Sequence, residues 1–128
     1  YGLDSLAELD ISNNQISDIS FISNLTELKF LNCSGNAFSD IAVLGTLTGL
    51  ERLWMIGNQV SDISALTSLT NIIEFDLRNN DIEDIEPLVN NAGLGGGDIV
   101  YLQGNQLSTT SVDAHIPVLE ARGVTVHY

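Results

Sequence analysis

Residues 28–49, LKFLNCSGNAFSDIAVLGTLTG, repeat the pattern of residues 6–27, LAELDISNNQISDISFISNLTE, position by position. Two further copies follow, residues 50–71, LERLWMIGNQVSDISALTSLTN, and the stretch from Ile72, IIEFDLRNNDIEDIEPLVNN. The shared pattern is L-x-x-L-x-L-x-x-N-x-I-x-D-I-x-x-L-x-x-L. A repeat of this length predicts a solenoid, in which each unit buries its apolar face against its neighbours. A solenoid favours an interaction surface over an active site.

The repeat also sets the expected organisation of the chain, which is one domain over residues 1–128 by its length. Leu3 lies one full unit before Leu25 and so matches the last leucine of a unit. We therefore expect residues 1–5 to end a truncated upstream repeat. The units that follow are expected at 6–27, 28–49, 50–71 and 72–96, with a last partial repeat at 97–109 and a C-terminal cap at 110–128.

The chain is strongly acidic, with 17 acidic against 4 basic residues and a formal net charge of -13. Nucleic acid and anionic lipid are excluded as expected partners, because like charges repel. Two interpretations of the charge stay open: it attracts a protein with a basic surface, or cations, or it only keeps the solenoid soluble. The sequence has no apolar run of membrane-spanning length and no signal-peptide pattern, so we expect no membrane insertion.

Each unit opens with a strand pattern and closes that strand with an asparagine. In LAELDI the apolar residues alternate, so Leu9 and Ile11 face one side while Glu8, Asp10 and Ser12 face the other. An amide both donates and accepts, so stacked asparagines are expected to bridge the backbones of neighbouring coils, whose polar groups would otherwise be buried unpaired. This predicted asparagine column comprises Asn14, Asn36, Asn58, Asn80 and Asn105.

A second column of the repeat is acidic and comprises Asp18, Asp40, Asp62 and Asp84. An aspartate accepts hydrogen bonds from backbone N–H groups just after it, so we interpret this aspartate column as caps of short helical turns. A calcium site is the alternative, because stacked carboxylates lie about 5 Å apart. Calcium needs six or more oxygen ligands from varied directions, which one column does not offer. We therefore predict no metal and no cofactor.

The segment NNAGLGGGD, which follows Val89, departs from the repeat and contains four glycines. It predicts a surface loop that lengthens one coil. A phosphate loop is excluded because no Gly-Lys-Ser/Thr follows the glycines and a strand comes next.

The C-terminal segment predicts a helix and a strand that cover the end of the core, as repeat proteins require. Thr110–Asp113 resembles a helix-capping signature. Pro117 is expected to kink or shorten the helix, Gly123 to end it, and residues 124–128 to form the strand. The apolar face of the helix comprises Val112, Ile116 and Leu119.

No catalytic arrangement is visible in the sequence, so we expect no enzyme. Cys33 takes the place of Ile11 in the strand pattern, which is a buried position, whereas a catalytic thiol needs a base and exposure. The two histidines, His115 and His127, have no metal-ligand spacing to another histidine or to the cysteine.

The phrases NNQISDIS, GNAFSDIA, GNQVSDIS and NNDIEDIE resemble the short 22-residue class of leucine-rich repeats found in bacterial internalins, and the same unit in eukaryotic phosphatase-regulating proteins. The tail GNQLSTTSVDAHIPVLEARGVTVHY resembles the closing segment of bacterial extracellular leucine-rich repeat proteins. Together these resemblances cover residues 3–128. They imply an α/β fold, a right-handed leucine-rich repeat solenoid with a parallel β-sheet on its concave face and short 3-10 turns on its convex face.

The same resemblance implies protein binding and an extracellular location or one at the bacterial cell surface. Internalin-type domains also carry a helical N-terminal cap and an immunoglobulin-like module, and this sequence shows neither. The resemblance therefore gives no expectation of adhesion or invasion.

The outward strand positions define the predicted concave face. Most are polar, but Phe30, Trp54, Ile56, Ile99 and Tyr101 are not. Aromatic residues on a rigid sheet beside charged residues have the composition of a protein-binding hot spot. Single apolar residues on a surface are normal, but here Phe30, Trp54 and Ile56 lie on adjacent strands and form one group. The predicted partner-binding residues are Phe30, Arg52, Trp54, Ile56, Asp76, Arg78 and Tyr101.

Two functions from different classes follow from these patterns. The first is a non-catalytic module that binds a protein partner on its concave face. The second is a structural unit that self-associates into oligomers or fibres through its N-terminal edge. There, Leu3, Leu6 and Leu9 are expected near an open end with an unpaired strand edge.

Overall fold

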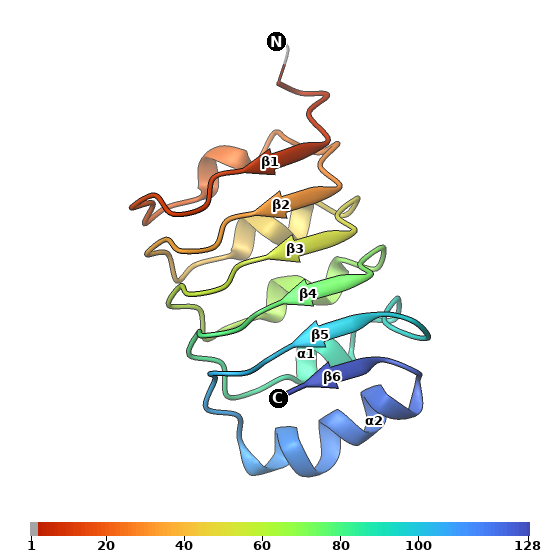
Figure 1. Cartoon of the computed structure of the whole chain (residues 1–128). Helices are drawn as coiled ribbons and strands as arrows, with labels where there is room; N and C mark the ends of the chain where they lie inside the picture. The colour runs from red at the N-terminus through yellow and green to blue at the C-terminus, as the bar shows by residue number, and fades with distance from the viewer. Residues whose placement is uncertain (1–2) are drawn as a thin grey trace.

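The computed structural model describes residues 3–128 and contains one parallel sheet whose six strands follow chain order (Figure 1). Each strand forms one step of a coiled chain, so neighbours in the sheet are neighbours in sequence. This arrangement confirms the predicted solenoid. The strands are β1 Glu8–Asp10, β2 Phe30–Asn32, β3 Arg52–Trp54, β4 Glu74–Asp76, β5 Ile99–Tyr101 and β6 Thr125–His127.

The strand register reproduces the sequence repeat. Glu8 pairs with Phe30, Phe30 with Arg52 and Arg52 with Glu74, each at the same position of the next unit. The next step along the chain, from Glu74 to Ile99, is longer than these three, as predicted from the glycines of the fourth coil. Because the period of a strand is two, this register fixes which side chains face the core and which face solvent.

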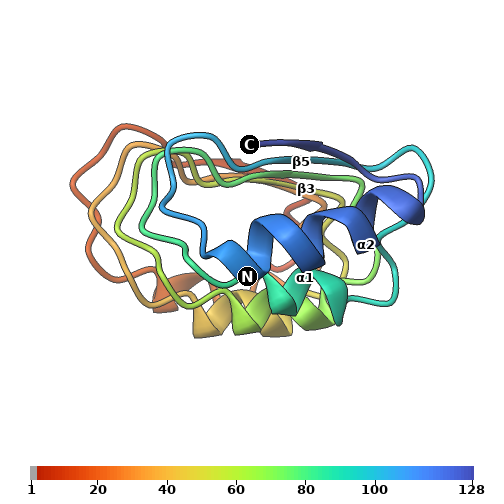
Figure 2. The ribbon, with the colours of Figure 1, turned by 90° about the horizontal axis from the view of Figure 1, so that it is seen from below.

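Short helical turns form a second layer on the far side of the core (Figure 2). Three are 3-10 turns: η1 Ser20–Ile22, η2 Ala42–Thr46 and η3 Ser64–Ser68. The fourth is a short α-helix, α1 Glu86–Val89, with Pro87 in its first turn, where a missing N–H costs nothing. Between the layers, the leucine and isoleucine positions of the repeat are buried in one continuous core.

Four asparagines of the column, Asn36, Asn58, Asn80 and Asn105, bridge neighbouring coils as predicted, whereas the Asn14 side chain donates only to carbonyls of its own coil. The Asn80 amide nitrogen donates to the Met55 carbonyl of the preceding coil and to the Leu77 carbonyl of its own coil, over 2.9 and 3.1 Å. Its oxygen accepts the Val60 N–H over 3.2 Å. Asn36 and Asn105 repeat this arrangement. The asparagines therefore supply the polar partners that strands and turns lack where the chain leaves the sheet.

The glycine-rich segment is only partly the surface loop expected from its composition. Asn91 takes the place of Leu69 in the next coil, a core position, and is fully buried. Its amide donates to the Leu66 and Leu69 carbonyls of the preceding coil. Gly93 passes so close to the Thr70 carbonyl that any side chain there would collide with it. The segment is a loop without helix or strand, as expected, but the expectation that it lies on the surface was wrong for Asn91 and Leu94, which are buried in the core.

The C-terminal segment crosses the open end of the core, as Figure 2 shows. It contains a π-helical turn, η4 Ser111–His115, helix α2 Ile116–Ala121, and then β6. The capping signature at Thr110–Asp113 was wrong: the Ser108 hydroxyl accepts the Ser111 N–H instead. Pro117, which was expected to kink or shorten the helix, lies in the first turn of α2, and the helical segment directly before it is widened to a π turn.

Candidate functional site

The predicted concave face is the side of the sheet turned away from the helical layer, and it carries the first and third residue of each strand. The middle residues, such as Leu31 and Leu53, are buried. Of the predicted partner-binding residues, Arg52 is exposed, and Phe30, Trp54, Ile56, Arg78 and Tyr101 are half-buried. Asp76 was expected to face solvent but is only 4% exposed, because its neighbours fold over it.

Two aromatic rings join β2 to β3 on this face. The rings of Phe30 and Trp54 meet edge to face, with centroids 5.0 Å apart and planes at 88°. The Trp54 indole N–H donates to the Glu74 carboxylate on β4 over 2.5 Å. An aromatic pair of this geometry is favourable and rigid. Trp54 is therefore held on both sides, by a ring and by a carboxylate.

An ion pair within the fourth coil lies beside Trp54. The Arg78 guanidinium donates to both oxygens of Asp76, from Nε over 2.8 Å and from a terminal nitrogen over 2.6 Å. The hydrogen bond to Asp76 raises the pKa of Arg78 above its ordinary value. The same guanidinium lies 5.2 Å from the centre of the Tyr101 ring. This explains the burial of Asp76: a forked cation covers it and rests on an aromatic ring.

His127 extends the aromatic surface to the last strand, and sequence reasoning missed it. Its ring stacks on Tyr101, with centroids 4.9 Å apart and planes at 10°. The residue was assigned to the C-terminal cap and not to the face. The signal was present in the sequence, because the strand predicted at 124–128 had only to be aligned with β5 to bring Tyr101 and His127 side by side.

The structure brings five of the seven predicted residues around one shallow hollow of about 350 Å³. Its lining comprises Trp54, Ile56, Glu74, Asp76, Arg78 and Tyr101. Phe30 touches the hollow only through Trp54. Arg52 and Phe30 line a separate depression with Glu8, Lys29 and Glu51. Glu74 is the residue of the hollow that the predicted set left out.

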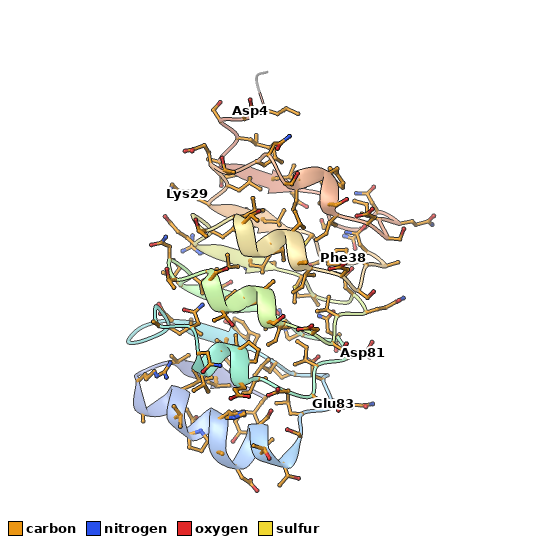
Figure 3. The ribbon with its side chains drawn as sticks, turned by 180° about the vertical axis from the view of Figure 1, so that it is seen from behind. Asp4, Lys29, Phe38, Asp81 and Glu83 are labelled. Carbon is orange, nitrogen blue, oxygen red and sulfur yellow. The ribbon has the colours of Figure 1, made fainter. Side chains whose placement is uncertain are left out.

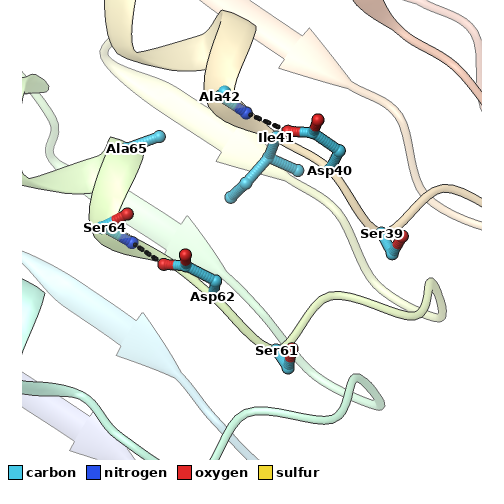
Figure 4. Close-up of a pocket in the computed structure, with 8 residues that line it drawn as sticks. All are labelled: Ser39, Asp40, Ile41, Ala42, Ser61, Asp62, Ser64 and Ala65. Carbon is cyan, nitrogen blue, oxygen red and sulfur yellow. Dashed lines mark hydrogen bonds between the residues drawn. The ribbon is translucent and has the colours of Figure 1, made fainter.

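The aspartate column lies away from this face, directly before the helical turns of the opposite layer. Figure 3 views the molecule from behind the sheet, with Asp81 and Glu83 on the edge where the coils turn. Here each aspartate of the column accepts the N–H two residues further on, over 2.8 to 2.9 Å. Figure 4 shows two of these contacts, from Ala42 to Asp40 and from Ser64 to Asp62, beside a pocket between neighbouring coils.

These contacts confirm the backbone role predicted for the aspartates, one position earlier than a helix cap. The helical turn of the third unit is capped by Ile63, and Asp62 before it closes a tight turn over that residue. The backbone N–H of Ser64 lowers the pKa of Asp62, and the N–H of Ser20 does the same for Asp18. Within residues 3–128, no three histidine, cysteine or acidic side chains are grouped as metal ligands.

Cys33 occupies the buried strand position that its register predicted. Its side chain is fully buried, and burial raises the pKa of the thiol to about 12. Such a thiol stays protonated and unreactive at neutral pH.

The chain belongs to the leucine-rich repeat family. The family model described as Leucine Rich repeats (2 copies) matches residues 4–46 and again residues 48–90. No curated protein matches the chain. In the described part of the chain, no helix has the length and apolar character to cross a membrane.

Within that family the chain is internalin-like. Internalin C2 of Listeria monocytogenes is 32% identical and superposes with a TM-score of 0.79 over 98% of this chain and 53% of that one. A second internalin of Listeria monocytogenes is 28% identical, with a TM-score of 0.74 over 86% of this chain and 38% of that one.

A leucine-rich repeat protein of Leptospira interrogans shares the fold at 17% identity, with a TM-score of 0.77 over 98% of this chain and 38% of that one. The chain thus spans about half the length of internalin C2 (53%) and less of the others. Fold and family are those of protein–protein interaction modules.

Proposed function

We propose that this chain is a non-catalytic module that binds a protein partner on its concave face, at the outside of a bacterial cell. The observation that carries the proposal is the aromatic surface from Phe30 to His127. It crosses five strands of a rigid sheet and contains two ring pairs, one on each side of the Asp76–Arg78 ion pair. Interfaces draw most of their binding energy from such packed aromatic and arginine residues.

The extracellular and bacterial part of the proposal is supported by the likeness to the two internalins of Listeria monocytogenes. The charge of the chain supports a partner with a basic surface. Most of the acidic side chains lie outside the strands, but their field still reaches a partner that approaches the sheet, and it would slow an acidic one. Within the face itself, Arg52 and Arg78 offset part of this charge locally.

The test uses two matched aromatic variants as bait. Trp54 lies on the concave face, whereas Phe21 is 60% exposed on η1, in the opposite layer. Immobilised wild-type protein, Trp54→Ala and Phe21→Ala are exposed to surface proteins of bacteria and host cells, and the captured proteins are identified by mass spectrometry. The proposal requires a protein held by the wild type and by Phe21→Ala and lost by Trp54→Ala. It is overturned if no captured protein depends on Trp54.

A specific observation favours self-association as a second function. In the described chain β1 is an edge strand, and the coil next to it leaves Leu3 and Phe21 exposed by 62% and 60%. An unpaired edge beside apolar side chains invites pairing with another chain. If this occurs, the molar mass from light scattering should fall to the monomer value in Phe21→Ala and in the pair Ala7→Lys, Glu8→Lys, but stay unchanged in Trp54→Ala. A monomeric wild-type protein, or an assembly that all these variants retain, contradicts it.

A further inference from the structure

The hollow on the concave face has a distinct chemistry of its own. Trp54 and Tyr101 stand on β3 and β5, on either side of Asp76 on β4. Strands lie about 4.8 Å apart, so the two aromatic side chains are separated by roughly 10 Å. A space of about 350 Å³ is at the small end of ligand pockets, which span roughly 300–1,000 Å³. It suits one long side chain of a partner, not an element of structure.

The two carboxylates of the hollow, Asp76 and Glu74, differ in whether a cationic side chain is bound to them. Asp76 is neutralised by the two hydrogen bonds from Arg78, and it is almost fully buried. Glu74 has no such partner: the Trp54 indole is the only hydrogen-bond donor to its side chain among residues 3–128, and it reaches one of the two oxygens. No basic side chain of the described chain lies within ion-pair distance of Glu74. One carboxylate charge is therefore left for a ligand.

The apolar lining completes the match. Ile56 and the Trp54 ring offer a surface for an aliphatic stem, and the ring face attracts a cation. Glu74 stands next to that ring and would accept a charge-assisted hydrogen bond. A stem that packs on Trp54 thus carries its head group to Glu74, the carboxylate of the hollow that has no ion-pair partner in the described chain.

We infer that the hollow is a subsite for a lysine or arginine side chain of the partner protein, held by the Trp54 ring and the Glu74 carboxylate. The inference rests on the proposed function, because it names the group by which the partner is anchored. It adds one requirement to the proposed function: the partner must carry a positively charged side chain where it contacts the hollow. A carboxylate of the partner bound to Arg52 and Arg78 would be the opposite chemistry.

The experiment uses three short peptides, acetyl-Gly-X-Gly-amide, in which X is arginine, citrulline or glutamate. Citrulline has the shape of arginine without its charge. Trp54 is the only tryptophan, so its indole N–H gives a single signal in the ¹⁵N-labelled protein and reports on the hydrogen bond to Glu74. We expect the arginine peptide to shift this signal in a saturable way, with a Kd in the millimolar range, and the citrulline peptide to bind at least about fivefold more weakly.

The variant Glu74→Gln should bind both peptides equally, whereas Glu8→Gln, the matched change in the same strand position on β1, should keep the preference for arginine. If Glu74→Gln fails to fold, added salt replaces it, because salt weakens binding of the charged peptide and spares the neutral one. Equal binding of arginine and citrulline to the wild-type protein, tighter binding of glutamate, or no shift with any peptide overturns the inference.

The two proposals fail separately. If the bait experiment finds a partner that depends on Trp54 but the arginine peptide does not bind, only the subsite is wrong. If the arginine peptide binds with the expected preference and no captured protein depends on Trp54, the proposed function is wrong and the subsite stands.

Discussion

The concave face and the turn edge are built by the same repeats, yet they use their side chains in opposite ways. At the turn edge the same residue recurs in four coils, and each aspartate binds the backbone N–H two residues further on. On the concave face the first strand position changes at every step: Glu8, Phe30, Arg52, Glu74, Ile99 and Thr125. The recurring aspartate binds the backbone in each coil, whereas the fold does not require one residue type at the first strand position, which is therefore available for recognition.

The largest effect is expected where a recurring residue is also buried. Asn80→Ala should lower the free energy of unfolding by about 3 kcal/mol, because it leaves the Val60 N–H buried without a partner and removes one donor each from the Met55 and Leu77 carbonyls. Urea unfolding of both proteins measures the difference. Asn14→Ala, the same change at an exposed position of the column, is the control and should cost much less. Equal losses would mean that the column does not act through burial.

Substitution of Trp54, at a strand position that differs from coil to coil, should have the opposite result: it should weaken binding of the partner and change the stability of the fold little. Trp54→Ala should weaken binding of the partner by at least about 2 kcal/mol, the usual loss at a central aromatic hot spot. Its unfolding free energy should fall by no more than about 1 kcal/mol, since the side chain is half-buried and loses one ring pair. Calorimetric titration and urea unfolding separate the two effects. A variant that unfolds would show that Trp54 belongs to the core and would break the comparison.

Substitution in the aspartate column should have a smaller effect, and only on the stability of the fold. Asp62→Ala should lower the free energy of unfolding by about 1 kcal/mol, the usual cost of losing a side-chain acceptor at the start of a helical turn. Binding of the partner should not change. Because the aspartates bind backbone N–H groups, millimolar calcium should leave Tm where it is. A rise of many degrees that EDTA reverses would instead make the column a calcium site.

The smallest expected effect is on the dependence of stability on pH. The backbone N–H of Ser64 lowers the pKa of Asp62 below its ordinary value of 3.8. A lowered folded-state pKa adds stability above the ordinary value, and that stability is lost as pH falls through the folded pKa. Asp62→Asn keeps an oxygen that can accept the N–H but removes the titration. Between pH 5 and pH 2, roughly, its unfolding free energy should fall slightly less than that of the wild type, and a steeper fall would contradict the assignment.

Much of the fold could be predicted because the same residue pattern recurs in each repeat unit. Asn36, Asn80 and Asn105 were expected to bridge coils and do so, since the repeat pattern aligns them without knowledge of the structure. The prediction weakened where the period breaks. Asn91 was expected on the surface, because it is polar where the earlier units have a buried leucine. It is buried because its amide donates to the Leu66 and Leu69 carbonyls, and these lie within reach only in the folded coil.

The candidate site shows the same division. The strand pattern placed Phe30, Trp54 and Tyr101 on one face, but it could not place Asp76, whose burial comes from the long side chain of Arg78 two residues on. Nor could it pair Trp54 with Glu74 across adjacent strands. Side-chain rotamers decide such contacts, and a register specifies only the starting positions of side chains.

By itself, then, the sequence determined the solenoid, its register and the face each side chain takes, because hydrophobic periodicity and repeated backbone hydrogen bonds are local and recur in every unit. The tertiary structure alone decided which neighbours on the concave face neutralise each other and which remain available. It pairs Arg78 with Asp76 and leaves Glu74 with only the Trp54 indole. The physical reason is that these contacts depend on distances of a few ångströms between side chains, which the rotamers of Arg78 and Asp76 set within one coil and the stacking of adjacent coils sets for Trp54 and Glu74.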